Sequence, residues 1–137
     1  MEATVRYLDG VKFEVAVRGH RVLCDQPVEN KGGDAGMSPP EFLLASLGTC
    51  AGYYALEYLR TRSLSVEGLS VNVKAEKALG PARLASFRIE IHVPGLTDER
   101  HRVGVLRAAK TCLIHNTLMA PPQIELVVKE DAAAATA

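Results

Sequence analysis

Residues 38–62 read SPPEFLLASLGTCAGYYALEYLRTR, and this stretch predicts one long helix around which the rest of the chain folds. Ser38 has the small hydroxyl side chain preferred at a helix N-cap, and the two prolines after it stand where backbone N–H groups have no intrahelical partner. Glu41 falls at the third helical position, where its carboxylate reaches back to the Ser38 N–H and completes a capping box. The sequence therefore specifies the start of this helix well.

The predicted helix is apolar on most of its surface. It carries no charged residue between Glu41 and Glu57. One face presents residues at spacings of four, three and four, namely Leu43, Leu47, Cys50 and Tyr54. A helix of this kind needs protein partners on several sides. Its uncharged run is shorter than the ~18–20 residues that a membrane-spanning helix requires, so we expect the helix to be buried in protein.

The composition of the chain is that of a globular domain. Its 137 residues are 47% hydrophobic, and we expect one domain over residues 1–131 with a disordered alanine-rich tail over 132–137. Sixteen basic residues balance sixteen acidic ones without a basic run, so we expect no partnership with nucleic acid or with a membrane. The first residues, MEATVRYLDG, show no signal-peptide pattern, and we expect a cytoplasmic location.

Segments on both sides of the helix alternate between apolar and polar residues, which is typical of strands with one buried face. The expected elements are a three-stranded meander (4–8, 11–18 and 21–25), an irregular glycine-rich loop (26–37), the long helix, a hairpin (66–77 and 84–93), a second helix and a final strand (124–129). We expect Thr97 to cap the second helix, Cys112 to lie near its end, and Pro121 to stop helical structure before the final strand. This order predicts an α+β fold.

The chain has three cysteines, Cys24, Cys50 and Cys112, without paired metal-ligand spacing. An odd number in this pattern argues against a secreted disulfide framework and against a zinc site, and we expect neither a metal nor a cofactor. Cys24 has no motif around it and is interpreted as a packing residue. For Cys50 and Cys112 two alternatives remain, which are thiol redox chemistry and ordinary burial.

Two thiols within reach of each other are sufficient for peroxidase chemistry. One thiolate attacks the O–O bond of a peroxide and becomes a sulfenic acid, and the second thiol condenses with it to a disulfide. Cys50 lies in the middle of the predicted helix, where the dipole of the helix N-terminus does not act. Activation of its thiol therefore has to come from a charged neighbour in the fold.

Two segments of the chain resemble the OsmC/Ohr family, the osmotically inducible and organic hydroperoxide resistance proteins. They read PEFLLASLGTC at 40–50 and CLIHNTL at 112–118, and the second is similar to a less-characterised OsmC-like branch. The resemblance covers almost the whole chain and implies an α+β OsmC-like fold, in which two chains intertwine as a homodimer around their cysteine helices. It also implies thiol-dependent reduction of organic hydroperoxides in stress defence, with Cys50 as the peroxidatic thiol and Cys112 as the resolving thiol. A dithiol, such as a lipoyl group, is the reductant that the resemblance implies.

The chain departs from the best-studied members of this family at three places. Pro40 takes the position of a glutamate, no arginine stands near the first hairpin turn, and Leu113 replaces the proline after the second cysteine. Arg18 and Arg21 are candidates for the missing arginine, although such residues more often face solvent. The resemblance therefore transfers the fold more directly than the activity.

Two further residues have both a structural and a catalytic interpretation. Glu41 either caps the helix or also polarises the thiol. His115, three residues after Cys112, is either a hydrogen-bonded structural residue or a base beside that cysteine. The function has an alternative as well, which is a non-catalytic protein that binds a small apolar ligand in the same cavity at the dimer interface.

Overall fold

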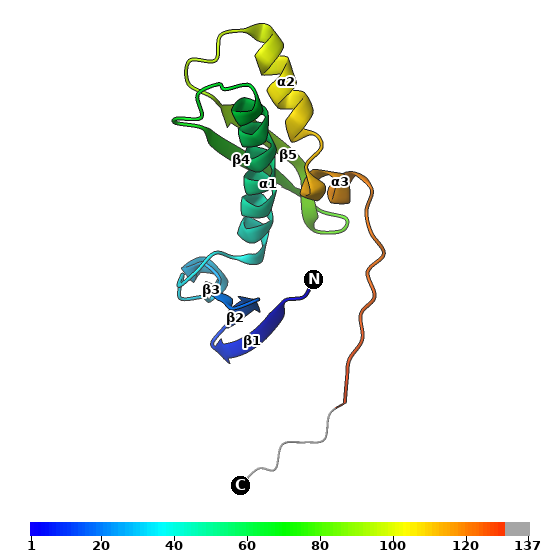
Figure 1. Cartoon of the computed structure of the whole chain (residues 1–137). Helices are drawn as coiled ribbons and strands as arrows, with labels where there is room; N and C mark the ends of the chain where they lie inside the picture. Colours follow the sequence, from blue (N-terminus) through cyan, green and yellow to red (C-terminus); the bar gives the residue numbers. More distant parts are fainter. Residues whose placement is uncertain (131–137) are drawn as a thin grey trace.

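The computed structural model describes residues 1–130, and the tail predicted for residues 132–137 lies outside them. Its elements follow the order β1 (Thr4–Asp9), β2 (Lys12–Val17), β3 (His20–Cys24), the short helical turn η1 (Val28–Asn30), α1 (Pro39–Thr61), β4 (Ser70–Ala78), β5 (Arg83–His92), α2 (Glu99–Ala109) and α3 (Leu113–Met119). Figure 1 shows α1 as a central rod, with β1, β2 and β3 beyond one end and the remaining elements along its length. The predicted α+β class is confirmed. Within residues 1–130, no helix is long and apolar enough to cross a membrane.

Helix α1 begins and ends where the sequence predicts. Ser38 is its N-cap and Arg62 its C-cap. The backbone N–H and the hydroxyl of Ser38 both donate hydrogen bonds to Oε1 of Glu41, at 3.1 and 2.6 Å. The contact between the glutamate and the N-cap residue that the sequence predicts is therefore present, and it fixes the first turn of the helix.

In the single chain, α1 is buried along one face only. Its buried residues recur every four positions and are Leu47, Ala51, Ala55 and Leu59. Ala55 and Leu59 form a core cluster with Val105 of α2. Tyr53 is 57% exposed, so the prediction that α1 is covered on several sides does not hold within one chain. The reason is that the remaining elements of one chain do not surround the helix (Figure 1).

The first three strands form the predicted antiparallel meander, in the order β1-β2-β3. Their bounds differ from the predicted ones by no more than one residue at each end, and the second turn is at Arg18 and Gly19 rather than at Gly19 and His20. Several large apolar side chains of this sheet are exposed, among them Val5, Tyr7, Val22 and Leu23. Val5, Tyr7 and Val22 share one face of the sheet, because Val5 and Val22 both pair with Val15, and an exposed apolar face of this kind is typical of a protein interface.

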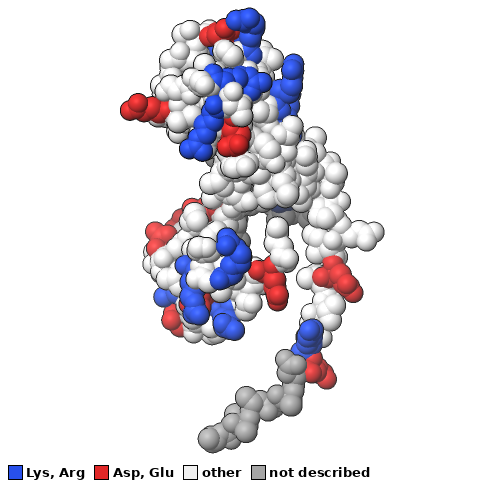
Figure 2. Space-filling view, in the orientation of Figure 1, with Lys and Arg blue, Asp and Glu red and all other residues white. Residues whose placement is uncertain are grey.

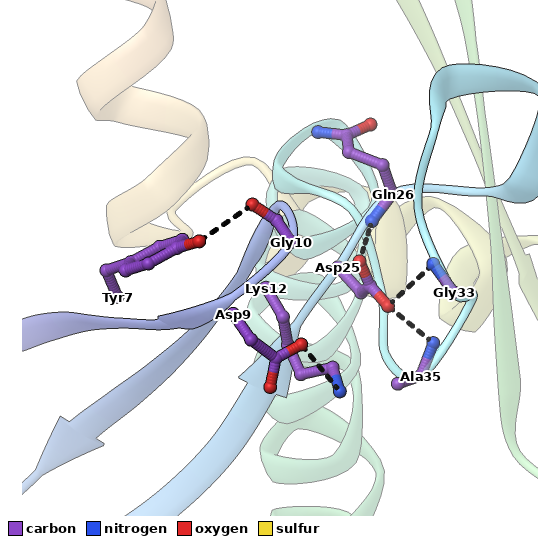
Figure 3. Close-up of polar contacts among 8 residues, drawn as sticks. All are labelled: Tyr7, Asp9, Gly10, Lys12, Asp25, Gln26, Gly33 and Ala35. Carbon is purple, nitrogen blue, oxygen red and sulfur yellow. Dashed lines mark hydrogen bonds and ion pairs between the residues drawn. The ribbon is translucent and has the colours of Figure 1, made fainter.

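The loop between β3 and α1 is organised by the carboxylate of Asp25 (Figure 3). Asp25 is buried and accepts hydrogen bonds from the backbone N–H groups of Gln26, Gly33 and Ala35, at 2.8, 3.1 and 3.0 Å. These hydrogen bonds lower the pKa of the Asp25 carboxyl, with the largest effect from the Ala35 N–H and the next from the Gln26 N–H, whereas burial opposes the shift. The loop has no periodic structure, as predicted, but a single carboxylate gives it a defined shape.

Strands β4 and β5 form the predicted second hairpin, which packs against α1. β4 begins at Ser70 rather than at Val66, because the Leu69 N–H donates to the Val66 carbonyl at 3.2 Å and closes a turn there. The close approach of β4 depends on Gly48 of α1, where an added Cβ would lie 3.0 Å from Cγ2 of Val73. Packing of the strand therefore offsets the low helix propensity of this glycine.

The second predicted helix differs from its prediction at both ends. Its N-cap is Asp98 rather than Thr97, because the Asp98 carboxylate accepts the Arg100 N–H at 2.9 Å. α2 ends three residues before Cys112, and this cysteine is instead the N-cap of the separate helix α3. α3 ends before Pro121, in agreement with the prediction that helical structure stops there.

The final strand predicted for residues 124–129 is not formed, and this prediction is wrong for the single chain. The segment leaves the body of the molecule in an extended form (Figure 1), and Ile124, Leu126 and Val128 are 81, 93 and 94% exposed. A strand is defined by hydrogen bonds to a neighbouring strand, and no strand of the described chain lies beside this segment. Its alternating apolar residues are therefore unpartnered.

Candidate functional site

The two cysteines singled out by the sequence, Cys50 and Cys112, lie next to each other. Cys50 is in the middle of α1 and half-buried, whereas Cys112 is fully buried at the junction of α2 and α3. Both are free thiols, and Cys50 is close enough to Cys112 to raise the pKa of the Cys112 thiol. The fold thus unites two groups that are sixty-two positions apart in the sequence.

The N-cap position holds the Cys112 side chain in place. Its Sγ atom accepts a hydrogen bond from the His115 N–H at 3.4 Å, and its own N–H donates to the Ala109 carbonyl at 3.2 Å. Burial raises the pKa of the Cys112 thiol and the neighbouring Cys50 adds to the rise, whereas the N–H groups of His115 and Ile114 oppose it. Cys112 is therefore protonated at neutral pH, and Cys50 is the thiol of the pair that solvent reaches.

Glu41 lies on the same helix as Cys50 but nine positions earlier, which is about 13.5 Å along the axis at the usual helical rise. Its carboxylate is bound by Ser38, whose hydroxyl and then backbone N–H lower the pKa of Glu41. Within one chain Glu41 therefore caps α1 and does not reach the Cys50 thiol. A catalytic role for this carboxylate would have to act across two chains.

His115 lies one helical turn beyond Cys112 and lines an apolar pocket of about 570 Å³. The pocket is bounded by α1, β5, α2 and α3, and its apolar lining includes Leu47, Ala51, Phe87, Ile89 and Met119. The Nδ1 atom of His115 is buried and has no hydrogen-bond partner in the part of the chain that the structure describes. This ring nitrogen is consequently available for a hydrogen bond to a ligand.

Neither candidate arginine lies beside the thiols. Arg18 is exposed in the turn between β2 and β3, and Arg21 on β3 forms an ion pair with Glu14 at 3.2 Å. Both belong to the N-terminal sheet, which lies beyond the end of α1 in Figure 1. Cys24 ends β3 of that sheet, half-buried and remote from the middle of α1. Among residues 1–130, no cluster of three or more His, Cys, Asp or Glu side chains could hold a metal ion.

Sequence reasoning missed two parts of this site. The alternation of Phe87, Ile89 and Ile91 predicts one buried face of β5, but not that this face lines a pocket near the cysteines. The break between α2 and α3 had no signal, because neither Gly nor Pro occurs between Ala109 and Leu113. The position of Cys112 at the start of a new helix therefore required the structure.

A family model for OsmC-like protein matches residues 32–127, which is more than half of the chain. No curated protein matches this sequence. The matched residues 32–127 include Cys50, Cys112, the whole of α1 and the β4–β5 hairpin.

Solved structures of other proteins share the fold. The chain is similar to a proposed osmotic stress induced and detoxification response protein from Psychrobacter arcticus 273-4, with 21% identity, 84% of this chain and 85% of that chain covered, and a TM-score of 0.77. It is similar to the organic hydroperoxide resistance protein OsmC of Legionella pneumophila, a predicted redox protein, with 17% identity, 86% and 89% covered, and a TM-score of 0.61. A proposed organic hydroperoxide resistance protein from Vibrio cholerae, with captopril bound in one of its active sites, has 17% identity, 88% and 86% coverage, and a TM-score of 0.67.

Proposed function

This chain belongs to the family of OsmC-like proteins, and on that premise we propose that it reduces organic hydroperoxides with the thiols of Cys50 and Cys112. The observation that carries the proposal is that these two free thiols are neighbours, one half-buried and one fully buried. Such a pair is what a two-cysteine peroxidase requires. The hydroperoxide resistance named for the Legionella pneumophila and Vibrio cholerae proteins supports the same chemistry.

In the proposed reaction, the thiolate of Cys50 attacks the O–O bond of a hydroperoxide ROOH. The terminal oxygen passes to sulfur as a sulfenic acid, and RO⁻ leaves and takes up a proton to become the alcohol ROH. The Cys112 sulfur then attacks the sulfenic sulfur, the S–O bond breaks, water leaves and a disulfide forms. A dithiol, such as a lipoyl group, reduces this disulfide by exchange, becomes a disulfide itself and restores both cysteines.

The surroundings of the two thiols support this division of roles. Cys50 is the more accessible, so a peroxide meets it first, and burial keeps Cys112 protonated and protected until Cys50 is oxidised. The resolving step has to remove the proton of Cys112. His115 is the candidate acceptor, because it follows Cys112 by three residues with its backbone N–H bonded to the Cys112 sulfur, and its ring Nδ1 has no hydrogen-bond partner among the described residues.

We also propose that two copies of the chain intertwine as a homodimer, with residues 1–131 of each copy as one domain. Three unpartnered surfaces support it: the exposed side of α1 with Tyr53, the exposed apolar side chains of the N-terminal sheet, and the extended segment 124–129. Each exposes large apolar groups that a second copy would cover. In such a dimer, the second copy would also be the source of an arginine or of Glu41 close to the Cys50 thiol.

A second candidate function is the binding of a small apolar ligand without catalysis. The apolar pocket beside His115 favours it, because its volume of about 570 Å³ is within the range of small-molecule sites. In this case the pocket would hold the ligand, with His115 Nδ1 as its one polar contact, and the thiols would stay reduced.

One experiment separates the two functions. Reduced protein is mixed with one equivalent of cumene hydroperoxide, and free thiols and the alcohol product are counted. A peroxidase loses the two thiols of Cys50 and Cys112, releases one alcohol per protein and recovers both thiols when dihydrolipoamide is added. Retention of an apolar probe in the pocket without loss of thiols would instead support the binding function and contradict the peroxidase.

A further inference from the structure

A second groove lies away from the cysteine pair, between the C-terminal end of α1 and the outer face of α2. It has a volume of about 580 Å³, and its lining includes Arg62, Arg100 and Arg107 together with Tyr58, Val103 and Thr111. Figure 2 shows Lys and Arg side chains gathered over the end of the molecule at which Figure 1 places α2. The groove is therefore basic, and nothing in the proposed peroxidase reaction uses it.

The guanidinium of Arg62 is held in a fixed orientation. It stacks on the ring of Tyr58, with its central carbon 3.7 Å from the ring centroid, and Nη1 donates to Oγ1 of Thr61 at 3.1 Å. The Tyr58 hydroxyl is in turn hydrogen-bonded to Nδ1 of His101 at 3.1 Å. Gly104 makes this arrangement possible, because a Cβ at that position would collide with the Tyr58 hydroxyl.

Two of the three groove arginines lack an acidic partner. Arg100 is paired with Asp98 at 3.0 Å, but in residues 1–130 neither Arg62 nor Arg107 forms an ion pair. The one acidic residue of the lining, Glu99, is paired with Arg102 outside the groove. The groove thus holds two exposed guanidinium groups that form no ion pair within the described residues.

We propose that this groove binds a small molecule that carries phosphate. A guanidinium presents its N–H donors in a planar fork that matches phosphate oxygens, and free Arg62 and Arg107 supply the two positive charges that a phosphate dianion requires. A ligand with a single carboxylate would neutralise only one of these two positive charges. Val103, which is exposed on the groove floor, offers an apolar contact to the remainder of the ligand.

The groove differs from a general basic surface because Arg62 is pre-oriented. An oriented side chain loses less conformational entropy on binding than a free one, so the stack on Tyr58 favours a specific ligand over loosely held counterions. Phosphate binding should therefore depend on the ring of Tyr58 as well as on the charge of Arg62.

The test uses the full chain and two probes, inorganic phosphate and pyrophosphate, titrated at low ionic strength and followed by backbone amide NMR shifts. We expect pyrophosphate to shift the amides around Gly104 and Thr111, and Arg62→Gln and Arg107→Gln each to weaken its affinity by about tenfold. Arg60→Gln is the matched control, because it removes the same charge from an exposed position on the same helix outside the groove. Tyr58→Phe keeps the ring and should retain binding, whereas Tyr58→Leu should weaken it.

Three results would overturn the proposal. They are no binding of either probe at millimolar concentration, shifts centred away from the groove, and an equal loss of affinity in Arg60→Gln. Arg60, Arg62 and Arg107 are surface residues, so their glutamine variants should fold as the parent protein does. Circular dichroism would verify this for every variant before the titration.

Discussion

The thiol of Cys112 lies close enough to Cys50 for Cys50 to raise its pKa, although the two residues are sixty-two positions apart along the chain. One cysteine projects from the middle of the long helix α1, and the other begins the short helix α3. This relationship makes chemistry between the two sulfur atoms feasible without a large movement of the backbone. It also has a consequence for stability, because one of the two thiols is fully buried.

Burial, and then the neighbouring Cys50, raise the pKa of the Cys112 thiol above its ordinary value of 9.0. The folded protein therefore holds this proton more tightly than the unfolded chain does. The contribution of this group to the free energy of unfolding is constant below pH 9.0 and is lost as the pH rises through the folded pKa. We expect denaturant titrations to show a steeper alkaline loss of stability for the parent protein than for Cys112→Ala. The same slope in both proteins would contradict a buried, protonated Cys112.

Glu41→Gln should lower the melting temperature by a few degrees at neutral pH. The Ser38 hydroxyl and N–H lower the pKa of Glu41 below its ordinary value of 4.5, so folding favours the carboxylate. That stabilisation is present above pH 4.5 and disappears as the pH falls through the folded pKa, and the two melting temperatures should converge in acid. Glu67→Gln, at an exposed position, is the control. If peroxide turnover vanished while the melting temperature stayed the same, the capping role would be incorrect.

Asp25→Asn should loosen the loop that leads into α1. In the parent protein Oδ1 of Asp25 accepts the Gln26 N–H, and Oδ2 accepts the N–H groups of Gly33 and Ala35 (Figure 3). The variant keeps the size of the side chain, but an NH₂ group, which cannot accept these bonds, replaces one of the two oxygens. We expect a lower melting temperature and faster proteolysis within residues 26–37. Asp34→Asn in the same loop is the control, because Asp34 is exposed. Equal proteolysis rates in the two variants would show that the carboxylate of Asp25 does not organise the loop.

The proposed homodimer predicts a specific effect of the C-terminal segment. Full-length protein should have the mass of two chains in light scattering, and a chain truncated after Gln123 should dissociate or aggregate, because it lacks the apolar residues at 124–129. A folded, stable monomer of the full-length chain at micromolar concentration would contradict the dimer. A truncated chain that dimerised as well as the parent would show that this segment has no part in the interface.

The features that the sequence predicted correctly are the ones that short-range interactions determine. The start of α1 depends on Ser38 and Glu41, which are three residues apart, and both hairpins depend on turns between adjacent strands. Thr97 and Asp98 are both good capping residues in adjacent positions, and only the contact with the Arg100 N–H distinguishes them. Local chemistry therefore predicts which helices and strands form, but it places their ends only to within a residue or more.

The features that the sequence did not predict depend on distant or separate groups. α2 ends at Ala109, although neither Gly nor Pro follows it before Cys112, and Cys112 then lies beside a residue sixty-two positions earlier in the chain. Residues 124–129 have a strand pattern, but whether a strand forms depends on a neighbour that one chain does not provide. The pocket beside His115 combines four elements, and no stretch of sequence contains more than a part of it.

The central claim is that Cys50 is oxidised first and Cys112 resolves it, and intact-protein mass spectrometry after one pulse of cumene hydroperoxide tests this most directly. The parent protein should lose the mass of two hydrogens as the disulfide forms. Cys112→Ser should instead retain a sulfenic acid at Cys50 that dimedone traps, and Cys50→Ser should remain unchanged, because its accessible nucleophile is gone. Equal oxidation of both single variants, or no oxidation of the parent protein, would contradict the account.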